Sequence, residues 1–378
     1  MSEKEYFCTL TPVGEYFLGG ERTFAFGENE AGNSKKTDYF IESENIPSQA
    51  TVFGTLRFLM LKKAGLLSDG YADESRREKQ AALVGAEGFA VGCGERTYGS
   101  LHSLGPVFLL HGEKRLVRAP MNHRLPTKEE RQAAEKAGRT PCYEPFVMKP
   151  QAGRTDLGAE ALLPERYDAK EGLFSGFLCL DDATSPLTAD WDIFAGQEHT
   201  RIAKWQDDDA FFKKVCKHFT DSAIRFAFYC TAEEGTLPDE ETVYLGQDKS
   251  TFRFTCREAD PETTGTMETL RAQLEKLPGT SGASVFYALS DTYMDIDEAA
   301  GDILAYAVVQ KRPFRTMETL RGAANFRDSR RKSALYQMVR AGSVFYVRPG
   351  KEEAFAALVK NTAMERVGFN SVQQLGGK

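Results

Sequence analysis

Residues 17–28, FLGGERTFAFGE, place two glycines, one arginine and several aromatic rings within one short stretch. Glycine lets a backbone approach a ligand closely, arginine binds phosphate or base edges through its planar fork, and aromatic rings stack on bases. The stretch directly follows a predicted strand, YFCTLTPVG, which ends at Gly14. These residue types predict a surface that holds a polyanion rather than a site for acid–base or nucleophilic chemistry.

A helix is expected to follow, beginning after Ser48 and ending near Gly65. Pro47 fixes φ at a helix entry, Ser48 can accept hydrogen bonds from first-turn amides, and Gly65 suits the C-terminal cap. A buried stripe at helical spacing is predicted for Val52, Leu56, Leu59 and Met60. The first helical amides, at Ser48 and Gln49, can hold one phosphate. Gly54, inside this helix, is interpreted as a mark of close backbone packing. The alternative is an ordinary amphipathic helix with a solvated basic edge.

Composition places the chain among globular proteins with more than one core. Its 378 residues favour two domains, and 26 Phe and 14 Tyr argue against disorder over most of the chain. No apolar run of membrane-spanning length and no secretory signal are visible, which predicts a cytoplasmic protein without a membrane partner. The seven cysteines form no C-x-x-C pair, which fits a reducing compartment and predicts neither a zinc site nor another metal or cofactor site.

The charge is unevenly distributed. The formal net charge is −7, which argues against indiscriminate nucleic-acid binding. Residues 311–348, however, hold ten Lys and Arg against two acidic residues. A basic patch on an acidic body is typical of a site-specific polyanion binder, and the alternative is a charged helix face without a ligand.

Strands and helices interleave in both halves of the chain, with hairpin-like pairs between crossovers. This pattern predicts an α+β fold of two ferredoxin-like βαββαβ domains packed side by side, over residues 1–195 and 196–378, with a long inserted region at about 66–171. One short strand is expected in GFAVGCGERTYGS (88–100) and a second in LGPVFLLHGEKRLVRAP (104–120). A short helix or turn is expected in DDDAFFKKVCKHFTDSA (207–223), and a helix or turn in RKSALYQM (331–338). The hexapeptide TMETLR occurs at 266–271 and 316–321, which we interpret as coincidence.

The sequence contains no recognisable catalytic motif. It lacks a G-x-S-x-G elbow, a Walker loop and H-E-x-x-H, and no two of its five histidines stand at i, i+4 spacing. A metal-independent ribonuclease needs only a positioned acid and base, for which His102, His111 and His123 are candidates. Each is more simply interpreted as a structural or surface histidine. The run at 207–209, three adjacent aspartates, is interpreted as a solvated acidic turn.

Several segments, in order, resemble one known family. They are LTPVGEYFLGGERTF, NIPSQATVFGTLR, QEHTRIAKWQDDDAFFK followed by FAFYC, YLGQDKSTFRF, LSDTYM, PFRTMETLRG, RAGSVFYV and GFNSVQQLGG. The chain resembles the RAMP subunit of type III-B CRISPR effectors (Cmr complexes) that caps the 5′ tag of the crRNA. The resemblance covers most of the chain apart from residues 66–170.

The resemblance implies an RRM-like, RAMP-type fold, no catalytic activity and no cofactor. It also implies a place in an RNA-guided antiviral complex. Its partners would be the crRNA 5′ tag, nearby single-stranded target RNA, the large polymerase-palm-like subunit and a neighbouring backbone RAMP subunit. A single-stranded tag would be held by aromatic stacking, by bonds to base edges and by Arg or Lys on phosphates.

The candidate RNA-binding residues combine the glycine–arginine–aromatic loop, the helix start, the basic segment and the glycine-rich tail. They are Gly19, Gly20, Arg22, Phe24, Ser48, Gln49, Arg57, Arg312, Arg315, Arg321, Arg327, Arg330, Arg331, Gly376 and Gly377. Two other functions stay open at this point. One is a metal-independent crRNA-processing endoribonuclease, and the other is a protein adaptor whose basic patch meets an acidic partner.

Overall fold

The structure is a computed structural model of the whole chain, and its description covers most of the residues. The described residues are 2–20, 40–67, 73–92, 94–138, 143–151, 161–165, 172–182, 186–202, 211–246, 249–277, 283–296, 302–319 and 330–376.

Contacts group the chain into two compact units, each built from several chain segments. Unit 1 comprises residues 1–112, 191–264 and 313–336, and unit 2 comprises 113–190, 265–312 and 337–378. The predicted boundary after residue 195 falls within a strand of unit 1, Phe194–Ile202. The division into domains at that residue stays a prediction.

The main sheet of unit 1 is antiparallel and centres on β1 (Glu3–Pro12). This strand pairs with β12 (Ile224–Glu233) on one side and with β14 (Ser250–Glu258) on the other. β14 also pairs with β13 (Glu240–Leu245). On its far side β12 pairs with both β3 (Leu101–Leu104) and β4 (Phe108–His111).

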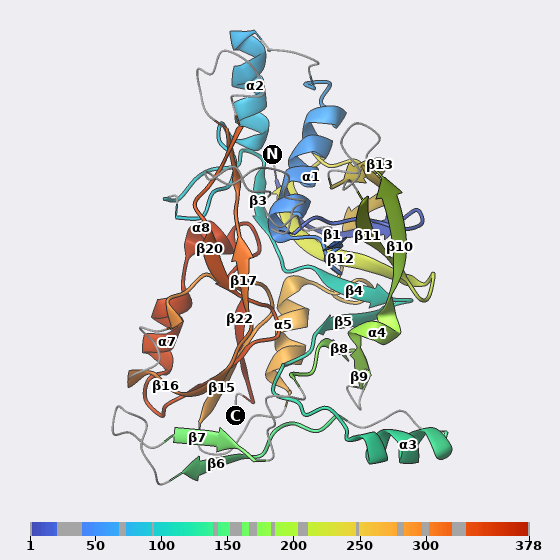
Figure 1. Cartoon of the computed structure of the whole chain (residues 1–378). Helices are drawn as coiled ribbons and strands as arrows, with labels where there is room; N and C mark the ends of the chain where they lie inside the picture. Colours follow the sequence, from blue (N-terminus) through green and yellow to red (C-terminus); the bar gives the residue numbers. More distant parts are fainter. Residues whose placement is uncertain are drawn as a thin grey trace, which may run out of the picture. The chain divides into compact units, whose positions relative to one another are not determined.

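A smaller sheet of unit 1 has the order β10-β11-β2. β10 (Phe194–Ile202) and β11 (Phe211–Phe219) form a long antiparallel hairpin. The short strand β2 (Phe40–Glu42) pairs with β11 in parallel. β10 and β11 are visible beside the main sheet strands in Figure 1.

The helix α1 (Gln49–Lys63) forms as its sequence predicts. The Ser48 side chain accepts from the Thr51 amide, which confirms the N-cap. At the other end Gly65 has a φ of +66°, and the Leu66 amide reaches back to the Leu61 carbonyl at 2.9 Å. The Gly65 amide also donates to the Lys62 carbonyl at 3.1 Å, and these two bonds form a Schellman motif. The predicted stripe is buried together with a further residue, in the set Val52, Phe53, Leu56, Leu59 and Met60.

Unit 2 contains a four-stranded antiparallel sheet in the order β16-β21-β15-β22. The strands are β15 (Ser284–Ala288), β16 (Leu304–Val308), β21 (Val344–Val347) and β22 (Val372–Leu375). Each neighbouring pair is antiparallel. The chain passes from β21 to β22 through α7 (Glu352–Val359) and α8 (Thr362–Glu365), and Figure 1 shows α7 beside this sheet.

The core of unit 2 forms where α7 meets this sheet. Phe355 of α7 is fully buried, and its ring centroid lies 4.9 Å from that of Phe286 and 5.1 Å from that of Phe345. Val359, one turn further, is buried in the same cluster. The spacing of apolar residues in EEAFAALV therefore suits a helix that packs one face on the sheet.

The remaining elements are short strands and helices. They are α2 (Glu74–Val84), β5 (Lys114–Arg118), α3 (Lys128–Lys136), β6 (Met148–Gln151), β7 (Ala161–Pro164), β8 (Gly176–Cys179), β9 (Leu187–Ala189), α4 (Asp190–Ile193), α5 (Met267–Glu275), β17 (Lys311–Phe314), β18 (Met317–Thr319), β19 (Arg330–Lys332) and β20 (Tyr336–Val339). β5, β8 and β9 pair in that order, β6 pairs with β7, β17 with β20, and β18 with β19.

The predicted α+β class is confirmed, with strands paired mostly antiparallel, and four local predictions are wrong. Residues 211–219 form the strand β11 and 336–339 the strand β20, where a helix or turn was expected. The described part of 88–100 contains no strand. No neighbouring atom comes within 4 Å of a Cβ built on Gly54, so this glycine does not mark close packing.

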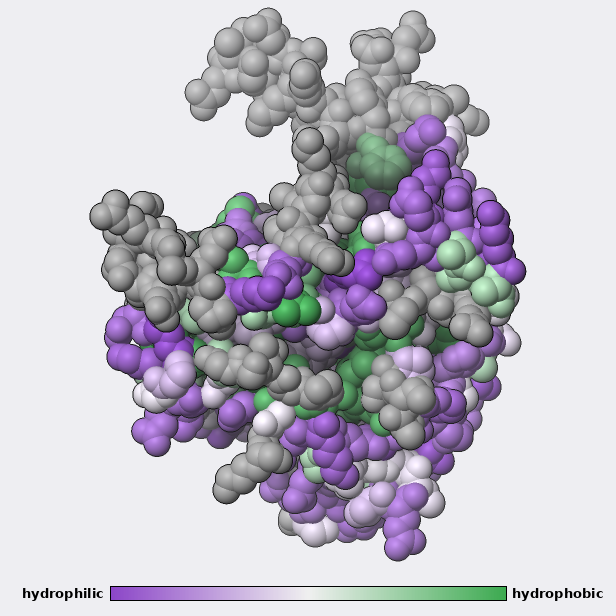
Figure 2. Space-filling model, turned by 90° about the horizontal axis from the view of Figure 1, so that it is seen from below, coloured by the Kyte–Doolittle hydropathy of each residue, from purple (hydrophilic) through white to green (hydrophobic). Residues whose placement is uncertain are grey.

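The described helices include none that is both long enough and apolar enough to span a membrane. Hydrophilic side chains predominate among the described residues on the face of the molecule that Figure 2 shows.

Candidate nucleic-acid interface

The chain segment that ends at Gly20 is fastened to its neighbours in unit 1 by backbone hydrogen bonds. Tyr16 and Lys217 of β11 exchange two bonds, with N···O distances of 2.8 and 2.9 Å. Two residues further on, the Leu18 carbonyl accepts from the Glu44 amide at 2.9 Å. The backbone is therefore held in place up to the predicted RNA-binding glycines, as expected for a binding loop carried on a rigid support.

The turn between β13 and β14 supplies a second fastening, at Phe17. The Phe17 amide donates to Ser250 Oγ at 2.8 Å. Gly246 has a φ of +74°, and a Cβ at this position would lie 2.5 Å from the Phe17 carbonyl oxygen. Only glycine fits such a position without moving the backbone. The glycine and the serine of the segment YLGQDKS thus both support Phe17, a role that the sequence alone did not reveal.

The chain returns beside the same support through β2. After β2 pairs with residues 213–215 of β11, the Ser43 amide donates to the Val215 carbonyl at 2.9 Å. The Ser43 hydroxyl accepts from the Leu18 amide at 2.8 Å. Ser43 therefore connects the segment before residue 21 with the segment after residue 39. Phe40, at the start of β2, exposes 45% of its surface, which leaves an aromatic ring accessible at this point.

Charges around this support are largely balanced. Three ion pairs involve the hairpin β10–β11. Lys213–Glu198, at 2.7 Å, lies within the hairpin. Lys217–Glu42 and, when the imidazole is protonated, His199–Glu15 at 2.7 Å connect it to neighbouring segments. The ammonium of Lys214 lies 4.5 Å from the centre of the Phe17 ring and is almost fully buried. A phosphate binding at this support would compete with the paired carboxylates, so charge alone would give little affinity.

Part of the predicted RNA-binding set lies outside the described residues. It consists of Arg22, Phe24, Arg321, Arg327, Gly377 and the side chains of Arg330 and Arg331. Of the rest, Gly19, Gly20, Ser48, Gln49, Arg57 and Arg315 belong to unit 1, and Arg312 and Gly376 to unit 2. Within unit 1, Gly20 lies beside the segment that enters α1, because a Cβ built on it would lie 2.9 Å from Glu44 Oε1.

Gln49 has a structural role in addition to its predicted one. Its side-chain amide donates to the Gly105 carbonyl at 2.8 Å, and its Oε1 accepts from the Val107 amide at 3.1 Å. The side chain is buried and joins α1 to the connection between β3 and β4. A phosphate contact through the first amides of α1 stays a prediction.

Arg57 is positioned by α1 to close the end of α2. Its Nε donates to the Val84 carbonyl at 2.8 Å and its Nη2 to the Gly85 carbonyl at 3.1 Å. Helix C-termini leave carbonyls without intrahelical partners, and a guanidinium satisfies two of them here. Burial lowers the pKa of Arg57 from its usual value. Two N–H groups of Arg57, a predicted RNA contact, therefore form hydrogen bonds within the protein.

We expect Arg57→Ala to lower the free energy of unfolding by about 2 kcal/mol, because two carbonyls at a helix end lose a charged donor. Urea unfolding of the variant measures this. Arg253→Ala, which removes an exposed arginine of β14, is the control and should unfold like the wild type. An Arg57→Ala variant of wild-type stability that binds tag RNA more weakly would instead favour the direct RNA contact predicted from the sequence.

Arg312 takes part in a network in unit 2. Its Nη1 donates to Asp291 Oδ2 at 2.9 Å, and the Ala341 amide donates to Asp291 Oδ1 at 3.0 Å. The Asp291 carbonyl accepts from the Asn370 amide at 3.1 Å. Both ionic side chains are mostly buried, with 20% of Arg312 and 13% of Asp291 exposed.

Asn370 extends this network with its side chain. Its φ is +52°. Its side-chain Oδ1 accepts from the Tyr293 amide at 2.8 Å, and its Nδ2 donates to the Tyr293 carbonyl at 3.0 Å. Its Nδ2 also donates to the Val359 carbonyl at 2.8 Å. LSDTYM, RAGSVFYV and GFNSVQQLGG, which are far apart in the sequence, therefore meet through hydrogen bonds of the Asp291 and Asn370 side chains and backbones. Two other predicted RNA-binding residues lie outside this network: Arg315 Nη1 donates to the Ser333 carbonyl, and Gly376 follows β22 with a φ of +65°.

Two of the three candidate histidines of the nuclease alternative have separate partners. His111 Nε2 lies 2.9 Å from Asp221 Oδ2, and the pKa of Asp221 is lowered by the Ala223 amide and by His111. His123 Nδ1 bonds the Pro120 carbonyl at 2.8 Å, and burial lowers the pKa of this histidine. His102 lies in β3. The nuclease alternative for these histidines stays a prediction.

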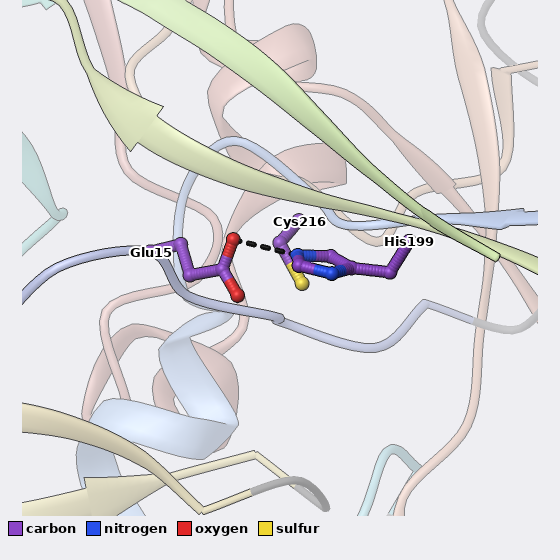
Figure 3. A group of neighbouring side chains, drawn as sticks. All are labelled: Glu15, His199 and Cys216. Atoms are coloured by element: carbon purple, nitrogen blue, oxygen red, sulfur yellow. Dashed lines mark hydrogen bonds and ion pairs between the residues drawn. The ribbon is translucent and has the colours of Figure 1, made fainter. Parts of the chain in front are cut away.

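A group of side chains that sequence reasoning missed lies at the support of the predicted loop. Figure 3 shows Glu15, His199 and Cys216 pointing toward one another. Their candidate ligand atoms all lie within 4.8 Å of one another, and Glu15 and His199 are 2.7 Å apart. Sequence spacing could not reveal the group because its members come from three separate segments.

No protein-family model matches the chain, and no curated protein sequence matches it. Solved structures that resemble it include two chains of type III-B Cmr-beta bound to cognate target RNA, one of them also with AMPPnP (state 1). The first has a TM-score of 0.44 and 12% identity over 98% of each chain. The second has a TM-score of 0.46 and 11% identity over 97% of this chain and 95% of that chain.

A third similar chain comes from the Csm3-Csm4 subcomplex of the type III-A CRISPR-Cas interference complex. Its TM-score is 0.34 and its identity 7%, over 90% of this chain and 92% of that chain.

Proposed function

We propose that the protein is a non-catalytic RNA-binding subunit of a type III CRISPR effector complex of the Cmr kind, which holds the 5′ tag of the crRNA. The observation that carries this proposal is the support for residues 21–39. Three segments quoted for the family resemblance meet there, namely residues 10–24, 197–213 and 244–254. A set of motifs that meet in space around one predicted binding loop supports a shared role for them.

The strand order of unit 2 supports the RAMP-type fold within this proposal. Antiparallel order β16-β21-β15-β22, with a helical crossover between β21 and β22, is that of a ferredoxin-like βαββαβ unit. In unit 1, β14-β1-β12-β3 with α1 between β1 and β3 follows the same order. Unit 1 departs from it between β12 and β14, where the chain forms the strand β13 instead of a helix. We propose two ferredoxin-like domains, with this departure in the first.

The charges favour stacking over phosphate binding as the main source of affinity at the loop. Residues 21–39 contain three basic and four acidic side chains, together with Phe24, Phe26 and Tyr39. The adjoining Phe40 is exposed, and the cations beneath are paired. Stacking of a base on an aromatic ring contributes about 1–3 kcal/mol and does not need a positive surface. The other partners in this proposal are the large polymerase-palm-like subunit, a backbone RAMP subunit and nearby target RNA.

A binding measurement on the assembled complex tests the role of the exposed ring. We expect Phe40→Ala to weaken binding of the tag RNA by about 1–3 kcal/mol, because one stacking surface is lost. Trp191→Ala removes another exposed aromatic of unit 1, on α4, and should leave binding unchanged. Equal binding by wild type, Phe40→Ala and Arg22→Ala would contradict the proposed mode. Metal-independent cleavage of the RNA that is lost in His102→Ala would instead favour the endoribonuclease.

A further inference from the structure

The antiparallel register of β10 and β11 places His199 and Cys216 on one face of the hairpin. Cys216 lies directly opposite Gln197. His199 is two residues beyond Gln197 and therefore points to the same side of the sheet. Diagonal neighbours of this kind lie within reach of each other's longer side chains. The backbone thus brings the imidazole and the thiol together.

Glu15 reaches the same face from a separate segment. Its neighbour Tyr16 exchanges two backbone hydrogen bonds with Lys217, the residue that follows Cys216. This bridge fixes the carboxylate beside the hairpin, where Oε2 lies 2.7 Å from His199 Nε2. Cys216 is nearly inaccessible and packs with Phe17 in a small apolar cluster, while the other two side chains are partly exposed.

We propose that Glu15, His199 and Cys216 bind a zinc ion. A carboxylate oxygen, an imidazole nitrogen and a thiolate sulfur are the three donor types that zinc takes in proteins. Zinc bonds of about 2.0–2.3 Å require the donor atoms to stand less than about 4 Å apart, so side-chain adjustments of about 1 Å suffice. A water molecule completes the tetrahedron. Binding releases the thiol proton of Cys216 to solvent and replaces the hydrogen bond between His199 and Glu15.

The ion would tie together the elements that support the predicted loop. Glu15 belongs to the chain leading from β1 to residue 20, and the other ligands belong to β10 and β11. Neither the family resemblance nor the cysteine spacing predicts this site. The inference does not depend on RNA binding, since the ligands are defined by geometry alone.

Metal analysis of the full-length protein tests the proposal. After growth in zinc-supplemented medium and dialysis, we expect about one zinc per chain for the wild type, because three protein ligands, one of them a thiolate, hold the ion. Cobalt substitution should give a thiolate-to-cobalt charge-transfer band and the visible absorption of a tetrahedral site. Glu15→Gln and His199→Gln alter partly exposed side chains and should weaken retention at least tenfold. Cys216→Ser should abolish the charge-transfer band.

Two substitutions elsewhere serve as matched controls. Cys179→Ser and His102→Gln should leave both the zinc content and the cobalt spectrum unchanged. The proposal is overturned if the folded wild type binds no zinc, or if its cobalt spectrum lacks the thiolate band. It is also overturned if the controls lose the metal as readily as the ligand variants. Tag RNA binding is measured separately, so failure of the zinc site is distinguishable from failure of the proposed function.

Discussion

Asp291→Ala is expected to lower the free energy of unfolding by about 3 kcal/mol, since removing one member of a mostly buried ion pair leaves the other charge uncompensated. Arg312 would lose its carboxylate, and the Ala341 amide would lose its acceptor. Urea unfolding followed by circular dichroism measures the change.

The matched control lies in the same unit. Asp302 pairs with Lys351 at 2.7 Å, but 82% of the aspartate side chain is exposed. Exposed pairs add little to stability, so Asp302→Ala should unfold close to the wild-type midpoint. If Asp291→Ala and Asp302→Ala behaved alike, the network around Arg312 would not stabilise unit 2. Arg312 would then be a stronger candidate for the RNA contact predicted from the sequence.

Gly246→Ala is expected to damage both stability and tag binding. The new Cβ would lie 2.5 Å from the Phe17 carbonyl oxygen, at a φ that disfavours alanine. Relief of the clash must move Phe17, and with it the backbone that leads to Gly19 and Gly20. We expect a loss of about 2–3 kcal/mol in unfolding free energy and a tenfold or greater loss in tag binding.

Gly235→Ala separates the effect of backbone strain from the effect of moving Phe17. Gly235 also has a positive φ, +80°, but no atom lies within 4 Å of a Cβ built there. This control should therefore show only the backbone cost of about 1 kcal/mol and unchanged RNA binding. Equal tag binding by the two variants would show that the position of Phe17 is not important for RNA recognition.

The hexapeptide TMETLR shows where sequence reasoning succeeds and where it stops. At 266–271 Thr266 forms a capping box with Thr269, and the apolar Leu270 and Leu274 are buried at helical spacing in α5. At 317–319 the same letters form the strand β18, paired with β19. Local signals decide the first case because cap and stripe lie within one segment. The second depends on a partner strand, which no short pattern contains.

In the candidate interface, too, local features could be predicted and tertiary contacts could not. The ends and the buried face of α1 were predictable because Ser48, Gly65 and the stripe are local features. The support for Phe17 was not, since Gly246 and Ser250 lie more than two hundred residues away in the chain. The sequence predicts Arg57 as an RNA contact, but its carbonyl partner at the end of α2 is a tertiary contact that the sequence does not reveal.

Photo-crosslinking of the purified effector complex tests the central claim most directly. A crRNA would carry 4-thiouridine either in the 5′ tag or in the spacer, and crosslinked peptides would be identified by mass spectrometry. The account predicts intact RNA and tag-dependent crosslinks to peptides of this chain between Phe17 and Glu42. Crosslinks from the spacer alone, or tag RNA that the complex cuts without metal, would contradict it.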